Sequence, residues 1–165
     1  MTRQTRTHLP EDEYLLLVGQ LAYMVSSIEG LIVFDLPGMA AYLPEGLNAG
    51  GLAGKTTGQI AGALTAAVAF IDDGDVRAYI DVAGRVLSEA SLIRNDVLHA
   101  RPATVDGKTC LNRWKLSDKR GPHLAFPITE DWLKEKIDML SEFSVRMNEV
   151  RCLHKNAAFT EEPSG

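Results

Sequence analysis

The sequence predicts an all-α protein: an up-and-down bundle of four to five helices, with a small β-hairpin insert before the last helix. Apolar residues recur at helical spacing in four long segments, and the connections between the first three segments are short. The chain has 165 residues, 45% of them apolar and 24% charged, which is typical of one compact soluble domain. We place this domain at residues 10–156, between expected flexible tails at 1–9 and 157–165.

The first helix is predicted from Pro10 to about Asp35. Proline is tolerated in the first turn, and the carboxylates that follow it favour the positive end of the helix dipole. Only one charged residue, Glu29, occurs between positions 14 and 34, so we expect a central helix that is apolar on nearly all sides. A buried lone carboxylate is costly unless paired, and Arg94 is one candidate partner; the alternatives are solvent or a different cation. The predicted inward residues are Leu17, Leu21, Met24, Ile28 and Leu31.

Two more helices precede the insert. The second is predicted from a cap at Thr56 or Thr57 through Ile71. The third runs from about Val76 to Ala100, because Pro102 disfavours helical geometry in the residue before it. The inward residues are Ile60, Leu64, Ala67, Val68 and Ile71 in the second helix, and Val76, Tyr79, Ala83, Val86, Ala90, Ile93 and Val97 in the third.

The insert occupies about residues 103–128. Residues 103–105 and 108–116 read as two strands joined by Asp106-Gly107, a dipeptide that supplies the positive φ angles of a type I′ turn. Thr129 is the predicted cap of the last helix, whose inward residues are Leu133, Ile137, Leu140, Met147 and Val150.

Composition and charge exclude several classes of protein. A net charge of −5 argues against binding nucleic acid over the whole surface. Two cysteines outside any C-x-x-C pattern and four dispersed histidines predict neither a metal site nor a cofactor, and the default setting is the reducing cytoplasm. We expect no membrane helix, since the apolar stretch at 61–71 falls well short of about 20 residues. We expect no secretory signal, since no apolar core follows the basic N-terminus.

Residues 49–56, Ala-Gly-Gly-Leu-Ala-Gly-Lys-Thr, match the relaxed phosphate-loop pattern with alanine in place of the first glycine. A phosphate loop follows a buried strand, whereas the residues before this one show no strand pattern. The preferred interpretation is a glycine-rich loop that leads into the second helix.

A second motif, Arg94-Asn95-x-x-x-His99, lies at the C-terminal end of the third helix. Asn95 and His99 are four residues apart and therefore share one face of the helix. The arginine–histidine spacing alone is weak, since Arg3 and His8 repeat it in the expected tail. The structural alternative is that Asn95 and His99 satisfy the helix end while Arg94 pairs with a carboxylate.

This motif, on the penultimate long helix of a small bundle, resembles that of the HEPN superfamily. The resemblance spans about residues 11–155, and it implies a metal-independent endoribonuclease whose two copies face one another across a shared cleft. His99 would then be the general base or acid, and Arg94 would bind the scissile phosphate. Asn95 would orient either the phosphate or His99. Supporting roles would fall to Glu29 and Asp96.

The region around the motif is basic. From Arg94 to His123 there are seven Lys or Arg and three Asp or Glu, a sum of +4, which leaves −9 for the rest of the chain. The candidate RNA contacts here are Arg101, Arg113, Lys115 and the stacking platform Trp114. The alternative is a solvated hairpin whose tryptophan caps the core.

Three hypotheses follow. The first is a cytoplasmic HEPN-like endoribonuclease, a homodimer that cleaves RNA without metal as a toxin or defence element. The second is a catalytically inactive HEPN-like binding or dimerisation module. The third is a regulatory or antitoxin-like protein that covers another protein with its apolar surfaces.

Overall fold

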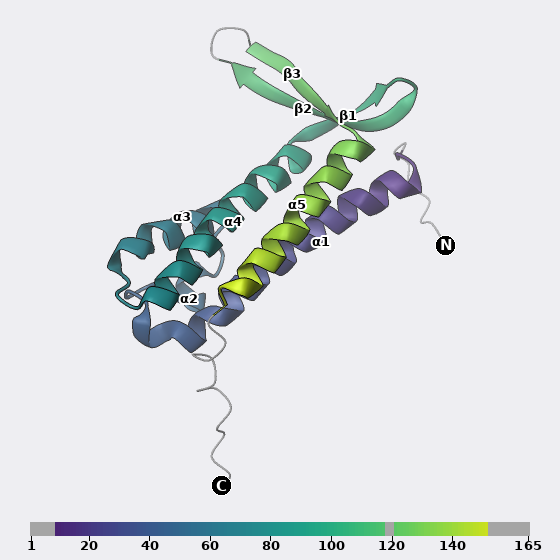
Figure 1. Cartoon of the computed structure of the whole chain (residues 1–165). Helices are drawn as coiled ribbons and strands as arrows, with labels where there is room; N and C mark the ends of the chain where they lie inside the picture. The colour runs from purple at the N-terminus through teal and green to yellow at the C-terminus, as the bar shows by residue number, and fades with distance from the viewer. Residues whose placement is uncertain (1–8, 118–120, 152–165) are drawn as a thin grey trace.

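The computed structural model describes residues 9–117 and 121–151. It is mostly helical, with a small three-stranded antiparallel sheet (Figure 1). In chain order the elements are α1 (Asp12–Asp35), the 3₁₀ helix η1 (Leu36–Tyr42), α2 (Ala49–Leu52), α3 (Thr57–Ala67), the 3₁₀ helix η2 (Val68–Phe70), α4 (Gly74–Leu98), β1 (Ala100–Val105), β2 (Lys108–Ser117), β3 (Gly121–Ile128) and α5 (Glu130–Glu149). The tail expected at 157–165, and residues 1–8 of the tail expected at 1–9, lie outside the described residues.

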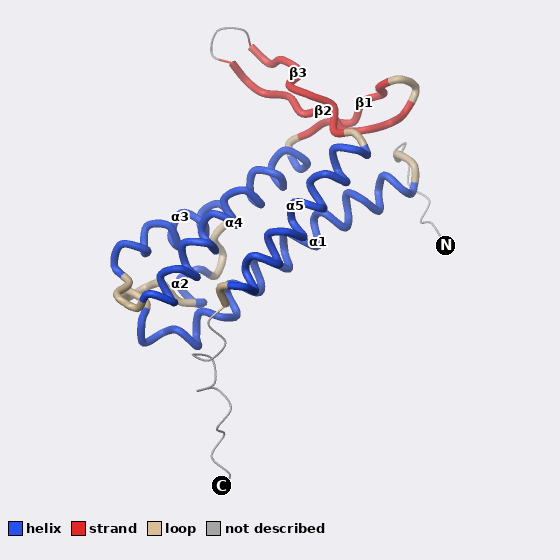
Figure 2. The backbone as a smooth tube through the Cα atoms, in the orientation of Figure 1, coloured by secondary structure: helices blue, strands red, loops and turns tan. Residues whose placement is uncertain are grey.

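The central helix is α4. It packs against α3, α1 and α5 (Figure 2), and all seven of its predicted inward residues are buried. In α3 and α5 the predicted inward residues are also buried, except Val68 and Val150, which are partly buried. The helical spacing of the sequence therefore identified the inner faces of α3, α4 and α5.

The expectation that α1 is central is wrong. Its inner face consists of Tyr14, Leu21, Val25, Ile28 and Ile32, so only Leu21 and Ile28 of the predicted set are fully buried. The opposite face is exposed. A helix that is apolar at nearly every position has no unique inward stripe, and sequence periodicity therefore could not select one.

Side-chain caps set where three of the helices begin. Thr56 caps α3 in a reciprocal capping box with Gln59, and Thr129 caps α5 through the N–H of Trp132 (3.2 Å). Asp73 accepts the N–H groups of the first turn of α4. At its C-terminal end α4 finishes at Leu98, and the chain enters β1 at Ala100.

The C-terminal end of α1 is tied to two other helices by one buried carboxylate. Asp35, 2% exposed, accepts a hydrogen bond from the hydroxyl of Tyr79 on α4 (2.8 Å). It also accepts two from the guanidinium of Arg151, just beyond α5 (2.7 and 2.6 Å). These hydrogen bonds raise the pKa of Arg151. Both carboxylate oxygens are thus satisfied, as a buried charge requires.

The sheet has three strands, where the sequence predicted two. Val105 pairs with Lys108 across the Asp106-Gly107 turn, whose φ angles of 51° and 78° suit a type I′ turn. The unpredicted strand is β3, which pairs antiparallel with β2. Its two prolines argue against a central strand, but β3 is an edge strand, where proline is tolerated. The sheet lies across the ends of α4 and α5 (Figure 1).

Among the described residues, Asp12–Tyr42 is long and apolar enough to cross a membrane, by length and composition alone. The core helix of a soluble protein meets the same criterion. The prediction of no membrane helix was based on residues 61–71 alone, and Asp12–Tyr42 is a longer apolar segment. In this fold the segment packs against α4 and α5.

Candidate functional site

The motif predicted from the sequence lies where α4 meets the sheet. Arg94 and Asn95 lie in the last turns of α4 and are half-buried, and His99 follows the helix as its exposed C-cap. The backbone N–H of His99 donates to the carbonyl of Asn95 (3.0 Å), which closes the last turn. The next residue, Ala100, begins β1. The motif is therefore on the surface, at a junction of two elements.

The three motif side chains are not held by the fold. Within residues 9–117 and 121–151, the side chains of Arg94, Asn95 and His99 make no hydrogen bond or ion pair. The structural alternative required Arg94 to be paired with a carboxylate, and the described part of the chain contains no such pair. All three side chains are thus free to contact a ligand.

The suggested Glu29–Arg94 pair is wrong. Glu29 is half-buried, and its carboxylate accepts a hydrogen bond from the hydroxyl of Thr57 (2.6 Å), the first residue of α3. The partner of the Glu29 carboxylate is therefore a buried hydroxyl group of the protein, and not a cation or solvent alone. Glu29 therefore joins α1 to α3 and does not position the motif.

Asp96 and Arg113 form an ion pair with each other. The guanidinium Nε of Arg113 on β2 lies 2.8 Å from Oδ1 of Asp96 on α4, and a second guanidinium nitrogen donates to the carbonyl of Trp114 (2.7 Å). Both side chains are largely shielded from solvent. This ion pair fixes β2 on α4. The prediction of Arg113 as an RNA contact is therefore wrong, because its guanidinium is already paired.

The other predicted RNA contacts are accessible and follow from the strand register. On β1, Arg101 is exposed and lies opposite Asn112, directly after the motif. Trp114 and Lys115, on β2, are exposed beyond the Asp96–Arg113 pair, and Trp114 pairs with Leu124 across the strands. The tryptophan does not cap the core. Two further basic residues of the segment, Lys119 and Arg120, lie outside the described residues.

The glycine-rich segment before α3 lies between the N-cap residues of two helices. Asn48 caps the short helix α2 through the N–H of Gly51 (2.8 Å), and Thr56 caps α3. Each described strand comes after residue 99, so no strand feeds this loop. The segment lacks the setting of a phosphate loop.

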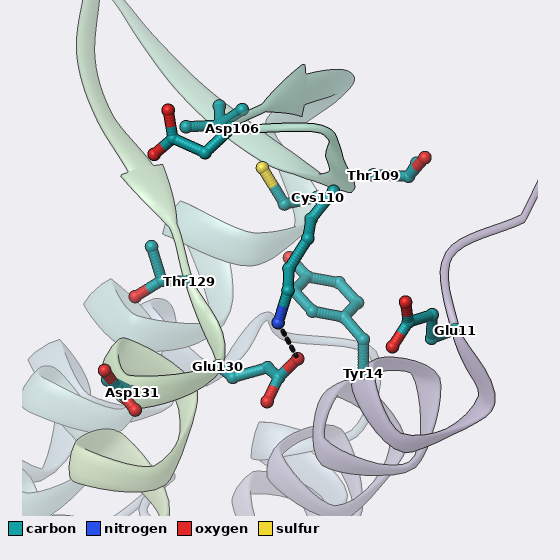
Figure 3. Close-up of a pocket in the computed structure, with 10 residues that line it drawn as sticks. Glu11, Tyr14, Asp106, Thr109, Cys110, Thr129, Glu130 and Asp131 are labelled. Carbon is teal, nitrogen blue, oxygen red and sulfur yellow. Dashed lines mark ion pairs between the residues drawn. The ribbon is translucent and has the colours of Figure 1, made fainter.

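A cavity of about 350 Å³, which the sequence did not indicate, lies between the sheet and the N-terminal ends of α1 and α5 (Figure 3). Four carboxylates line it, and Lys108 reaches one of them, Glu130 (3.8 Å). The other three are Glu11, Asp106 and Asp131. Its net negative charge repels phosphate, so this cavity is not a site for nucleic acid.

Two neutral groups complete that cavity. Tyr14 donates its hydroxyl to the carbonyl of Ile128 (2.8 Å) and accepts the N–H of Leu111 (3.0 Å), which fastens α1 to the sheet. Burial raises the pKa of the Tyr14 hydroxyl and that of the Cys110 thiol. The thiol therefore stays protonated at neutral pH and is a poor nucleophile.

No family model, curated protein or solved structure matches this chain. Within the residues that the structure describes, no group of three or more His, Cys, Asp or Glu could hold a metal ion.

Proposed function

We propose that this chain is a HEPN-like, metal-independent endoribonuclease with its active site at the junction of α4 and the sheet. One observation carries the proposal: Arg94 and His99 are both solvent-accessible, and neither side chain has a partner among the described residues. Polar groups that are shielded from solvent are usually hydrogen-bonded within the protein, so the half-buried Arg94 without such a bond keeps its donors available. A phosphate group is the ligand that a free arginine fork binds best.

The reaction needs no group beyond the chain and the RNA. The 2′-hydroxyl attacks the adjacent phosphorus, a new P–O2′ bond forms, and the P–O5′ bond breaks. His99 accepts the proton of the 2′-hydroxyl or returns one to the departing 5′-oxygen. Arg94 stabilises the charge that grows on the phosphate oxygens, and Asn95 orients the phosphate or the imidazole.

The RNA path continues from the motif onto the sheet. Arg101, two residues after His99, and Lys115 on β2 supply exposed positive charge, and Trp114 offers a ring on which a base can stack. Arg101 pairs with Asn112, which lies on the same face of β2 as Trp114, whereas Lys115 belongs to the other face. A strand of RNA that contacts His99 would therefore reach Arg101 and the aromatic platform on one face of the sheet.

The proposal has finer features. The up-and-down bundle follows from the short connections between the first three helices, and the cytoplasmic location from the cysteine usage. The homodimer with facing motifs, the toxin or defence role and a cognate antitoxin-like protein follow from the resemblance.

The decisive experiment is RNA cleavage in the presence of a chelator. We expect the wild-type protein to cut RNA in excess EDTA and His99→Ala to lose at least about a hundredfold in rate. The matched control is His123→Ala, which removes an exposed histidine of β3 outside the motif and should leave the rate within about twofold.

Other outcomes contradict the enzyme. Cleavage that needs a divalent ion, or that survives in His99→Ala, would remove the motif from catalysis. Binding of RNA without cleavage would favour the catalytically inactive module instead.

A further inference from the structure

The outer face of α1 is an exposed apolar surface. Leu16, Tyr23 and Phe34 are 69%, 76% and 80% exposed, although they belong to the most apolar long helix of the described residues. They recur with smaller residues at three- and four-residue spacing along one line of the helix. We call this line the α1 strip: Leu16, Gly19, Tyr23, Ser26, Gly30 and Phe34.

The α1 strip carries no charge. Nine positions between residues 16 and 34 are exposed, and none is Asp, Glu, Lys or Arg. Each copy of the chain has a net charge of −5, and two acidic surfaces brought together would repel one another. A neutral apolar strip about 27 Å long is a surface on which two copies can approach without that repulsion.

The two glycines have no role inside one chain. A Cβ atom added at Gly19 or Gly30 would find nothing within 4 Å, and neither residue has a positive φ. Glycine is poorly suited to a helix interior, where it is normally used when another backbone must come close. Since no described element approaches these glycines, the close neighbour is expected from another molecule.

We infer that the α1 strip packs against the α1 strip of a second copy, with the two helices antiparallel. In this orientation Tyr23 of one copy meets Ser26 of the other, a large residue against a small one, and Gly19 meets Gly30, which lets the two backbones approach closely. Leu16 then lies near Phe34 at each end. Every contact is made twice, as a two-fold interface requires.

Charge also favours the antiparallel orientation. Each strip is preceded by Glu11, Asp12 and Glu13. Parallel helices would bring the two acidic groups together, whereas antiparallel helices hold them apart by nearly the length of α1. The helix dipoles also favour the antiparallel arrangement.

A membrane fits the strip less well than a second copy. To span a bilayer, α1 would have to leave α4 and α5 and break the hydrogen bonds of Tyr14 and Asp35. To lie on a membrane surface, an amphipathic helix normally carries Lys or Arg, and α1 has neither. Its first turn is acidic, which anionic lipid headgroups repel.

The inference does not rest on the proposed ribonuclease. The N-terminal end of α1 lies at the sheet, since Glu11 and Tyr14 line a cavity with residues of β1 and β2. Antiparallel α1 helices therefore place the two sheets, and the two motifs, at opposite ends of the pair. A dimer with facing motifs would need a different surface.

Sedimentation of the full chain over a range of concentrations tests the interface. We expect a dimer with a dissociation constant in the micromolar range or weaker, because a strip about 27 Å long and roughly one helix wide buries less than the lower limit of a standard interface, about 1,200 Å². Tyr23→Asp and Gly30→Leu should each raise that constant at least about tenfold. Gly30→Leu should also raise the melting temperature of the monomer, since leucine favours the helix. Leu92→Asp, which replaces an exposed leucine on α4 outside the strip, is the matched control and should leave the dissociation constant unchanged.

Disulfide trapping tests the orientation. In a chain with Cys110 and Cys152 replaced by alanine, the pair Tyr23→Cys and Ser26→Cys should form a covalent dimer. Tyr23→Cys alone should not, and RNA cleavage should persist in Gly30→Leu. Three results would overturn the inference: a monomeric wild type, a dimer unaffected by both strip variants, or a monomer that floats with phosphatidylcholine vesicles. Trapping by Tyr23→Cys alone would overturn the orientation.

Discussion

Glu29 is held by a hydroxyl group and not by a cation, and this determines what its removal should do. Its hydrogen bond from Thr57 joins α1 to α3, and among the described residues no ion pair connects Glu29 with Arg94. A hydrogen bond to a charged acceptor contributes about 1 kcal/mol when it is partly exposed. The residue stabilises the helices and has no part in binding phosphate.

We therefore expect Thr57→Val to lower the free energy of unfolding by about 1 kcal/mol and to leave RNA cleavage unchanged. Valine keeps the shape of the side chain and removes only the donor. Urea unfolding and a cleavage assay at the same pH measure the two effects. A variant that keeps its stability but loses cleavage would link Glu29 to the motif after all.

Cys110 makes the stability of the fold depend on pH. Its burial raises the thiol pKa in the folded chain, so the folded state holds the proton to a higher pH than the unfolded state does. The stabilisation is complete below the unfolded pKa, about 8.5, and is lost as pH rises toward the folded value. Urea unfolding at pH 7.5 and pH 9.5 should show a decrease that is smaller in Cys110→Ala. An equal decrease in both proteins would remove the thiol as a cause.

At the scale of elements, the network of Asp35, Tyr79 and Arg151 holds the ends of three helices together. Arg151→Met leaves Asp35 as a buried charge with a single hydroxyl partner. Such a loss destabilises by about 3–5 kcal/mol. Arg146→Met, which replaces an exposed arginine near the end of α5, should cost less than about 0.5 kcal/mol. Thermal unfolding compares the two, and similar losses would show that Asp35 does not depend on Arg151.

The elements also show how far the sequence determines this fold. Spacing and capping residues predict α3, α4 and α5 because each has one apolar stripe and a polar remainder. The inner face of α1 could not be predicted, since apolar residues occur on all its sides. The strand β3 was not predicted, and its sequence signal is weak because proline disfavours strands; only an edge position makes Pro122 and Pro127 tolerable.

The candidate site was predictable only in part, for a similar reason. The order Arg94, Asn95 and His99 is visible in the sequence, as is the basic segment around it. Which cations are free depends on contacts between elements: Asp96 occupies Arg113, whereas Arg101 and Lys115 remain exposed. The sequence also did not indicate the acidic cavity, because its residues come from α1, the β1–β2 hairpin and α5.

For the whole molecule, the fold separates three surfaces. The basic motif lies where α4 meets the sheet, the acidic cavity lies between the sheet and the ends of α1 and α5, and the neutral α1 strip runs along the outer side of α1. The net charge of −5 is an average over these unlike regions. An anionic polymer would therefore be steered toward the end of α4 and away from the cavity.

The chemistry of the RNA ends tests the proposed ribonuclease most directly. An RNA oligonucleotide is incubated with the protein in EDTA, and the new ends are identified by mass spectrometry. Attack by the 2′-hydroxyl predicts a 2′,3′-cyclic phosphate and a 5′-hydroxyl, together with complete resistance of an oligonucleotide that is 2′-deoxy throughout. A 5′-phosphate with a 3′-hydroxyl, or cleavage of the 2′-deoxy oligonucleotide, would contradict it.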